Sequence, residues 1–464
     1  MEPAATIRSH LEAYLSAQHM SINQFSIQTG INSGTLSRLL NGQQPIAMSH
    51  LELITRGMGV PEDHFYSLYV DECFYHSAPT WRRLRPFILS SAALGRLDCI
   101  ELVVRNLLDN LIYAPMLFEV AEGLFQEGQW QAAAVLYKNV SASEKYQHSE
   151  RLAICQYRLF RISIGDSQVL NLQAALLFEC YIERLEVADQ LDGLKHLMHV
   201  YYSLHKWDKV DELALEMLRL ATLSYNFQHP SGRKDRSEKA PEKPLYFYIL
   251  YSYLMRSSVQ EEYGDYTAAL NLIPQYMEAD WIQEDSDEVR ETLAQFKLWG
   301  TANTHLYRVM AGQYEGLQDY VDYISNHEGQ VFTAVYNIIK SANRYGWNID
   351  YILARFSKHV PYEPYNSGFG KYNHQIIADQ HARFLTELAM YNLHNKRHDG
   401  ISVILKSLES SVRINNESLI IKCVNLFEQH RHEASEEEQV QYKFLIREVQ
   451  DPNDQKVYHV SNFV

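Results

Sequence analysis

The sequence predicts an all-α fold, and three observations carry that prediction. Apolar residues recur at helical spacing both in the first sixty residues and in the long remainder of the 464-residue chain. The chain holds 13 prolines and 20 glycines, which favours long helices joined by short turns. Small or turn-forming residues then recur between apolar helical segments from residue 85 onward. We expect a small helical head followed by a long array of helical hairpins.

The composition sets limits on the class of protein. Apolar residues make up 46% of the chain and charged residues 21%, so a buried core can form. We find no apolar run near 18 residues and no basic-then-apolar leader, so we expect a cytoplasmic protein without a membrane span. The cysteines are five, an odd number without a Cys-x-x-Cys pair, and we expect them to be reduced and packed in the core: Cys73, Cys99, Cys155, Cys180 and Cys423.

The head begins with two short helices around one glycine, in residues 21–42. Phe25 and Ile31 bracket Gly30, where a tight turn needs a residue that tolerates positive φ. This is the helix-turn-helix pattern, in which the second helix enters the DNA major groove. We therefore expect DNA contacts from the outward side of the second helix and its ends: Asn32, Ser33, Thr35, Ser37, Arg38 and Asn41.

Flanking helices over 7–18 and 48–57, and another starting at 60–63, complete the head. Five helices within residues 6–68 resemble the Xre/Cro-type repressor head. Ile22 departs from that family, which often has glutamine at this position to brace a phosphate and a recognition side chain. The alternative is a head that no longer binds DNA and only dimerises or packs. We expect the DNA-binding domain to cover residues 1–68 and a linker helix to cover 69–84.

The charge of the chain limits how this head binds. The net charge of −15 argues against a general coat for nucleic acid. Residues 1–65 contain no lysine and only the arginines Arg8, Arg38 and Arg56. One head would neutralise ~3 phosphates, against the ~6–10 contacts of a strongly salt-dependent binder. We therefore expect a homodimer on a palindromic operator of double-stranded DNA.

Three further arginines follow the head: Arg82, Arg83 and Arg85. They would either add phosphate contacts or be solvated helix residues.

From residue 85 to 415 we expect repeated helical hairpins. In the clearest repeat, residues 118–137, Ala121 and Ala133 sit at a close helix crossing, Gly128 turns the chain and Trp130 packs the corner. This unit resembles the tetratricopeptide (TPR) repeat, and further corners fall at positions 97, 130, 167, 207, 266, 314, 347 and 398. We expect surface loops at 228–244 and 361–373, and closing helices that serve dimerisation at 416–464.

A stack of such hairpins forms a right-handed α-solenoid whose concave face is built by the first helix of each pair. That face suits extended peptides, because an asparagine amide both donates to and accepts from a peptide backbone. Counting from the corners places His199, Glu262, Asn303, Asn337 and Glu387 on inward positions. For each one, a solvated or helix-packing role competes with ligand contact. The acidic balance leads us to expect a short peptide that carries positive charge.

An Xre-type head followed by degenerate TPR repeats is the arrangement of the RNPP peptide-pheromone receptors and of the phage arbitrium receptors. The chain is similar in length and in its loose repeats to the arbitrium-like branch. The resemblance implies a cytoplasmic quorum-sensing transcriptional regulator that is switched by a short imported signalling peptide. Family members hold the peptide backbone with asparagines on inner helices, a role that Asn303 and Asn337 would match.

Two rival classes of function follow from the same residues. One is a TPR regulator that sequesters a partner protein, with the DNA-binding head secondary. The other is an enzyme, which we do not expect. His394 and His398 lie one helical turn apart, but no glutamate sits between them as in a zinc hydrolase. Residues 368–371 are too short for a phosphate loop. We expect no catalytic residue, no metal and no cofactor.

Overall fold

The computed structural model describes residues 6–74, 79–146, 149–165, 167–228, 239–359, 373–397, 399–414 and 416–450. All regular elements in these ranges are helices, which confirms the all-α class. The chain divides into two compact units: unit 1 holds residues 1–164 and 173–186, and unit 2 holds residues 165–172 and 187–464. Among the described residues, no helix has both the length and the apolar character needed to cross a membrane.

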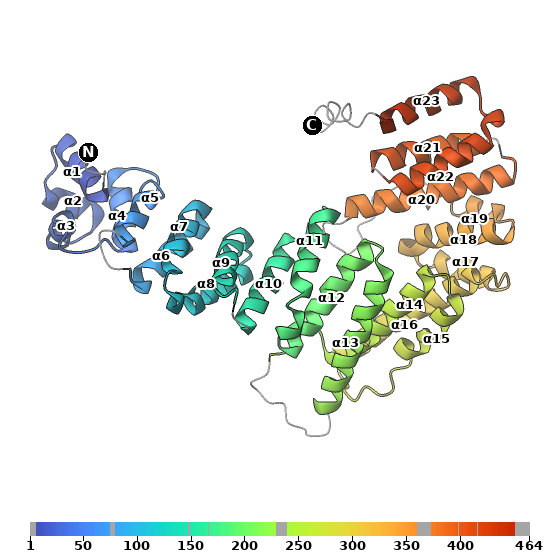
Figure 1. Cartoon of the computed structure of the whole chain (residues 1–464), viewed down its shortest axis with the longest axis horizontal. Coiled ribbons are helices and arrows are strands. Elements are labelled where there is room, and N and C mark those ends of the chain that lie inside the picture. Colours follow the sequence, from blue (N-terminus) through green and yellow to red (C-terminus); the bar gives the residue numbers. More distant parts are fainter. Residues whose placement is uncertain are drawn as a thin grey trace. The chain divides into compact units, whose positions relative to one another are not determined.

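Unit 1 opens with five helices that form the head (Figure 1): α1 (Ile7–Ala17), α2 (Ile22–Thr29), α3 (Ser33–Leu40), α4 (Met48–Met58) and α5 (Tyr66–Phe74). Gly30 ends α2 with φ of 75°, so the predicted tight turn is confirmed. The fifth helix does not start at 60–63 as predicted. Residues 62–65 form turns instead, closed by hydrogen bonds from His64 N to Pro61 O and from Tyr66 N to Asp63 O.

The rest of unit 1 continues as helices packed in sequence: α6 (Trp81–Ala93), α7 (Leu97–Leu107), α8 (Ala114–Gln126), α9 (Trp130–Ser143), α10 (Glu150–Ser163) and α11 (Gln168–Glu179), which spans both units. Because α5 ends at Phe74 and α6 starts at Trp81, residues 69–84 are not the single linker helix that we predicted. One apolar core runs without a break from α1 into α10. Tyr66 and Tyr69 of α5 both pack edge-on against Phe87 of α6.

Unit 2 is a second array: α12 (Val187–Ser203), α13 (Trp207–Gln228), α14 (Leu245–Glu262), α15 (Tyr266–Met277), α16 (Asp287–Met310), α17 (Gly316–Ser325), α18 (Val331–Tyr345), α19 (Asp350–Arg355), α20 (Asn373–His394), α21 (Gly400–Arg413), α22 (Glu417–Gln429) and α23 (Glu436–Gln450). Each of α14, α16, α18 and α20 also contacts the next even-numbered helix. The even-numbered helices from α14 to α22 thus form one continuous layer. Short 3-10 helices cover Leu111–Tyr113, Ile182–Arg184, Glu328–Gln330, Ser357–His359 and Arg431–Glu433.

The predicted repeat corners coincide with the starts of helices. The helices nearest the first seven corners start within three residues of them, at Leu97, Trp130, Gln168, Trp207, Tyr266, Gly316 and Asp350. Position 398, residues 229–238 of one predicted loop and residues 361–372 of the other lie outside the described residues.

Ala121 and Ala133 are fully buried, as a close helix crossing requires. Trp130 does not pack the corner as predicted, because 54% of its surface is exposed. Of the cysteines, Cys180 is exposed and the other four are buried, so the core-packing prediction is wrong for Cys180 alone.

Candidate functional site

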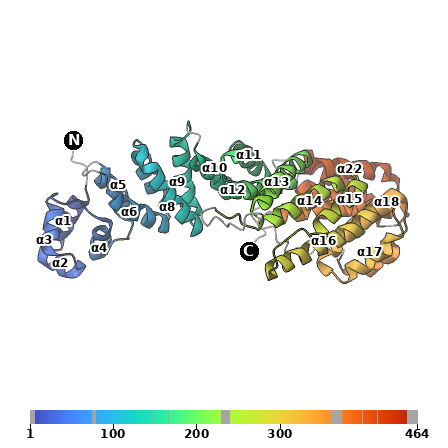
Figure 2. The same ribbon diagram turned by 90° about the horizontal axis from the view of Figure 1, so that it is seen from below.

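The first candidate site is the outward surface of α3. Leu36 and Leu39 turn inward and are buried, which fixes the opposite face toward solvent. The structure brings all six predicted DNA-binding residues to this surface and its ends: Asn32, Arg38 and Asn41 are exposed, and Ser33, Thr35 and Ser37 are half-buried. In Figures 1 and 2, α3 lies on the side of the head away from α6. The surface carries hydroxyl and amide groups around a single cation.

The polar side chains of this surface are ordered by local hydrogen bonds. Asn32 caps α3, because its side-chain oxygen accepts from the Gly34 amide at 2.9 Å. Arg38 Nη2 donates to Thr35 Oγ1 at 3.3 Å, and the Asn41 amide donates to Ser37 Oγ at 3.4 Å. The contacts of Arg38 and Asn41 are longer than an ordinary hydrogen bond, so they can be exchanged for contacts to another molecule.

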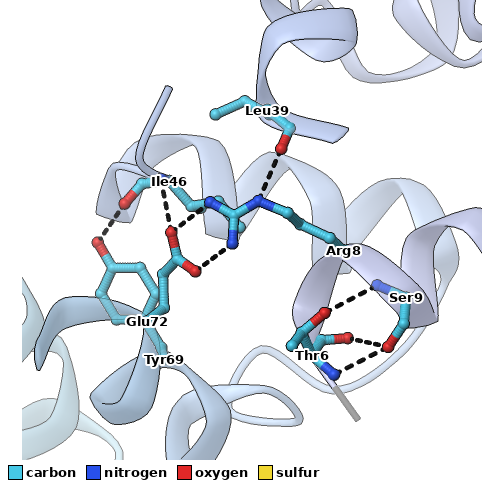
Figure 3. A network of polar contacts seen from close by, with 7 residues as sticks. All are labelled: Thr6, Arg8, Ser9, Leu39, Ile46, Tyr69 and Glu72. Atoms are coloured by element: carbon cyan, nitrogen blue, oxygen red, sulfur yellow. Dashed lines mark hydrogen bonds and ion pairs between the residues drawn. The ribbon is translucent and has the colours of Figure 1, made fainter. Parts of the chain in front are cut away.

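Arg8 has a structural role that the sequence did not reveal (Figure 3). Its guanidinium meets the carboxylate of Glu72 at 2.5 and 2.6 Å, and its Nε donates to the Leu39 carbonyl at 2.8 Å. Glu72 is only 2% exposed. Arg8 therefore ties α1 to α5 and to the end of α3, and it is engaged within the head. Our count of three phosphate-neutralising arginines falls to two, Arg38 and Arg56.

The same network fixes the chain that leaves α3. Ile46 N donates to Glu72 Oε1 at 3.4 Å, and the Tyr69 hydroxyl donates to the Ile46 carbonyl at 2.9 Å (Figure 3). A buried carboxylate thus organises the backbone at the end of α3 and in the segment that follows it. Glu72 lies 64 residues from Arg8, and no local pattern indicates such a pairing.

The arginines after the head divide into two kinds. Arg83 is only 9% exposed, and its Nε donates to Thr80 Oγ1 at 3.3 Å. Neither of the two predicted roles fits it, since it is neither solvated nor placed to meet a phosphate. Arg82 and Arg85 are exposed.

Ile22, at the position where the resembling family often has glutamine, is half-buried and packs against the head core. The start of α2 is fixed by a capping box between Ser21 and Gln24, in which Gln24 Oε1 accepts from the Ser21 amide at 2.8 Å.

The second candidate site lies in unit 2. The five predicted peptide-binding residues fall one each on the even-numbered helices α12, α14, α16, α18 and α20. His199 is half-buried, with Nε2 2.7 Å from the Tyr251 hydroxyl. Burial lowers the pKa of His199 to about 4, and Lys195 adds to the effect. His199 is therefore a neutral hydrogen-bonding group at physiological pH.

The two asparagines differ in accessibility. Asn303 is half-buried, and its side-chain amide donates to the Tyr276 hydroxyl at 3.2 Å. Asn337 is only 6% exposed. For Asn337, burial favours the helix-packing role over contact with a ligand.

Glu262 and Glu387 lie on different helices but act on the same tyrosine. Burial, then the charge of Glu387, and more weakly that of Glu262, raise the pKa of Tyr336 to about 12. Glu387 is held by Lys422 at 2.8 Å and by the Asn343 amide at 2.9 Å, whereas Glu262 is exposed at the end of α14. Charged groups from α14 and α20 thus both act on the pKa of a tyrosine of α18.

Sequence reasoning missed Glu261 and the tyrosines around it. Burial, and then the neighbouring charge of Glu262, raise the pKa of Glu261 to about 7, and the hydroxyl of Tyr307 contacts its carboxylate. Burial likewise raises the pKa of Tyr202 and Tyr251, with Glu261 and Glu262 adding to the effect at Tyr202. The signal available in the sequence was the adjacent pair of glutamates at the end of one helix.

A cavity of about 330 Å³ lies at the corner between α12 and α13. It holds none of the predicted peptide-binding residues and is lined by His205, Lys206, Trp207, Asp208, Lys209 and Tyr263. A second cavity of about 200 Å³ lies beside Trp130 in unit 1. Both are shallow features of helix corners and are too small for an extended peptide.

Within the described ranges, no three His, Cys, Asp or Glu side chains are grouped so as to hold a metal ion. A scan against protein-family models finds no match to the chain. A search of curated proteins also finds no match.

Proposed function

We propose that this chain is a DNA-binding transcriptional regulator whose α2 and α3 act as a helix-turn-helix, with α3 entering the major groove. The observation that carries the proposal is the exposed polar face of α3, held on a buried apolar face and on the Arg8–Glu72 network. Hydroxyl, amide and guanidinium groups are those that read base edges and phosphates. With two free arginines per head, Arg38 and Arg56, the protein would bind a palindromic operator as a homodimer.

The unit 2 layer is proposed to hold a short signalling peptide. His199, Asn303 and Glu262 offer an acceptor or donor, an amide and a carboxylate on three even-numbered helices. An amide such as that of Asn303 can bind a peptide backbone in either direction. Glu261 and Glu262 favour a ligand with a positive group, because a cation stabilises their ionised forms. Peptide binding would shift DNA affinity only through different affinities for two conformations.

The DNA-binding part is tested with the full chain by selection from a random duplex library, followed by binding assays on the selected site. The head shares one core with α6 to α10, so it is kept in the whole protein. Arg38→Ala should weaken binding by about tenfold or more, since it removes the only cation on α3. The matched control is Arg105→Ala, also an exposed arginine of unit 1. Equal affinity of the Arg38 variant and the wild type would exclude α3 as the reading helix.

The peptide-binding part is tested by calorimetry with synthetic peptides cut from the ends of small open reading frames beside the gene. Asn303→Ala should weaken peptide binding and leave the affinity for DNA unchanged. Loss of both activities would point to misfolding, and no binding by any peptide would remove the receptor hypothesis.

One observation favours the rival function, a regulator that sequesters a partner protein. Arg8 is engaged with Glu72, which leaves the head poor in free cations. Failure of the duplex selection, together with retained peptide binding, would favour this rival.

A further inference from the structure

The chain contains one asparagine that is followed directly by glycine, Asn41 before Gly42, and this pair lies at the end of α3. Asparagine loses its side-chain amide most readily before glycine, because glycine has no side chain to shield its backbone nitrogen. Asn41 is exposed and directly follows the last residue of α3, and helix ends are the parts of helices that open most often. The pair is therefore accessible to solvent and lies where the backbone can rearrange.

The side chain of Asn41 is held only weakly. Its only side-chain hydrogen bond with the described residues runs from its amide to Ser37 Oγ and is long, at 3.4 Å. Asn32, which precedes the small residue Ser33, differs because its side-chain oxygen caps α3 with a contact of 2.9 Å. The step after Asn41 is also uncrowded, since a Cβ added at Gly42 would lie 4.0 Å from Arg8 Nε.

We propose that Asn41 is a site of spontaneous deamidation, which places a carboxylate on the recognition surface. The Gly42 backbone nitrogen gives its proton to hydroxide and attacks Cγ of Asn41. The Cγ–Nδ2 bond breaks, and the leaving nitrogen takes a proton from water and departs as ammonia. A cyclic imide remains, and water opens it at either of its two carbonyl groups. The products, aspartate and isoaspartate, each carry a carboxylate, and the overall reaction consumes only water.

The fold controls how often this reaction can start. The Gly42 amide donates to the Leu39 carbonyl at 3.2 Å, so its nitrogen is engaged while the end of α3 is closed. The same carbonyl accepts from Arg8 Nε at 2.8 Å, and Arg8 is held by Glu72 (Figure 3). Ring closure therefore requires local opening at the end of α3. The Arg8–Glu72 network slows the reaction, because it stabilises the closed end.

A new carboxylate at this position would weaken DNA binding, because the head is poor in cations. It would offset one of the two free arginines, Arg38 and Arg56, and would repel the phosphates. An amide both donates and accepts hydrogen bonds, whereas a carboxylate only accepts, so a contact from Asn41 to adenine would be lost as well. This consequence rests on the proposed DNA binding, whereas the deamidation itself does not.

The deamidation is tested on the full chain without DNA. The folded protein is kept in mildly alkaline buffer, and peptide mapping by mass spectrometry follows the conversion of Asn41 with time. We expect Asn41 to convert faster than any other asparagine that the structure describes, and faster in alkaline than in mildly acidic buffer. Arg8→Ala should speed the conversion severalfold, because the end of α3 then opens more often.

The matched variant is Gly42→Asn. Asparagine tolerates the positive φ of 69° at this position, and its side chain shields the backbone nitrogen. Conversion of Asn41 that is no faster in the wild type than in Gly42→Asn would overturn the proposed site. Conversion in the denatured chain without conversion in the folded chain would overturn it too. An unchanged rate in Arg8→Ala would overturn the control by the Arg8–Glu72 network.

The effect on DNA is measured with fresh and aged protein on the duplex obtained by library selection. Aged wild type and Asn41→Asp should bind about tenfold or more weakly than fresh wild type, whereas aged Gly42→Asn should bind like its fresh form. Asn41→Ala should lose less affinity than Asn41→Asp, because it adds no charge. Equal affinity of fresh and converted wild type would overturn the effect on DNA. If the fresh protein selects no duplex, the proposed function fails, while mass spectrometry still decides the deamidation.

Discussion

At the scale of single residues, the arginines Arg8 and Arg38 have different environments within the head. Both are arginines of a head that is poor in cations. Arg38 is exposed on α3, whereas Arg8 forms a two-pronged contact with the buried carboxylate of Glu72. A charge buried in this way is stabilised by its partner and becomes costly when the partner is removed. Arg8 thus holds the end of α3 from the interior of the head, through its hydrogen bond to the Leu39 carbonyl.

Arg8→Ala should destabilise the head by about 3 kcal/mol, because it removes the main cation beside a buried carboxylate. The effect should appear as faster hydrogen exchange in α1, α3 and α5. The control is Arg56→Ala, an exposed change expected to stay within about 0.5 kcal/mol. Unchanged exchange in α3 would show that the network does not hold the recognition helix.

Glu261 gives the chain a pH-dependent stability. Its pKa is raised to about 7, so the folded protein keeps a proton that the unfolded chain loses near its ordinary value of 4.5. Stability should therefore fall as pH rises from about 4.5 to 7 and change no further above that.

Glu261→Gln should be more stable than the wild type at pH 8, by on the order of 1–3 kcal/mol, with the difference vanishing near pH 4.5. Denaturant unfolding at the two pH values measures this, with exposed Glu409→Gln as the control. An equal difference at both pH values would contradict the raised pKa.

At the scale of elements, the head depends on one close helix approach. Gly57 of α4 faces α2, where an added Cβ would overlap the Thr29 methyl group and lie 3.0 Å from the Phe25 ring. The Gly57 carbonyl also accepts from the Gln28 amide at 2.7 Å and from the Tyr14 hydroxyl at 3.3 Å. Glycine at this position lets α1 and α2 bind the backbone of α4 directly.

Gly57→Ala should destabilise the head by about 1–3 kcal/mol, because α2 must move away from α4. Since α3 follows α2 directly, operator affinity should fall as well. The matched control is Gly123→Ala in α8, where an added Cβ meets nothing within 4 Å. That change should be neutral or stabilise the chain by up to about 1 kcal/mol. Thermal unfolding of both variants measures this difference. Equal melting curves for Gly57→Ala and Gly123→Ala would contradict the close approach of α2 and α4.

At the scale of the whole molecule, the head is not a free domain on a linker. Its apolar core continues into α6 to α10, and the division of the chain into two units falls around residues 165–187 instead. In the proposed function, a peptide bound to unit 2 would therefore not act by loosening the head from α6 to α10.

The proposed dimer makes a quantitative prediction about salt. Two heads with two phosphate-contacting arginines each predict a slope of log affinity against log salt of about −4. Arg38→Ala should bring the slope toward half that value, because it removes one of the two arginines of each head. Binding titrations across a salt series measure both slopes. A slope near −10 would mean that many more cations meet the DNA than the head exposes.

The sequence alone determined the all-α class, the turn at Gly30 and the starts of the helices at seven repeat corners. These follow from local rules: apolar spacing, capping residues and glycines at positive φ act within a few residues along the chain. The six residues of the α3 surface also follow from helical spacing within one short segment.

Only the tertiary structure decided which charges are free. Arg8 pairs with Glu72, which lies 64 residues away in sequence. Arg83 and Asn337 are buried within the packed helices, and Glu262 and Glu387, from two different helices, both act on the pKa of Tyr336. The continuity of the head core with α6 is of the same kind. Burial and pairing depend on which helices pack together, and no local pattern in the chain encodes that choice.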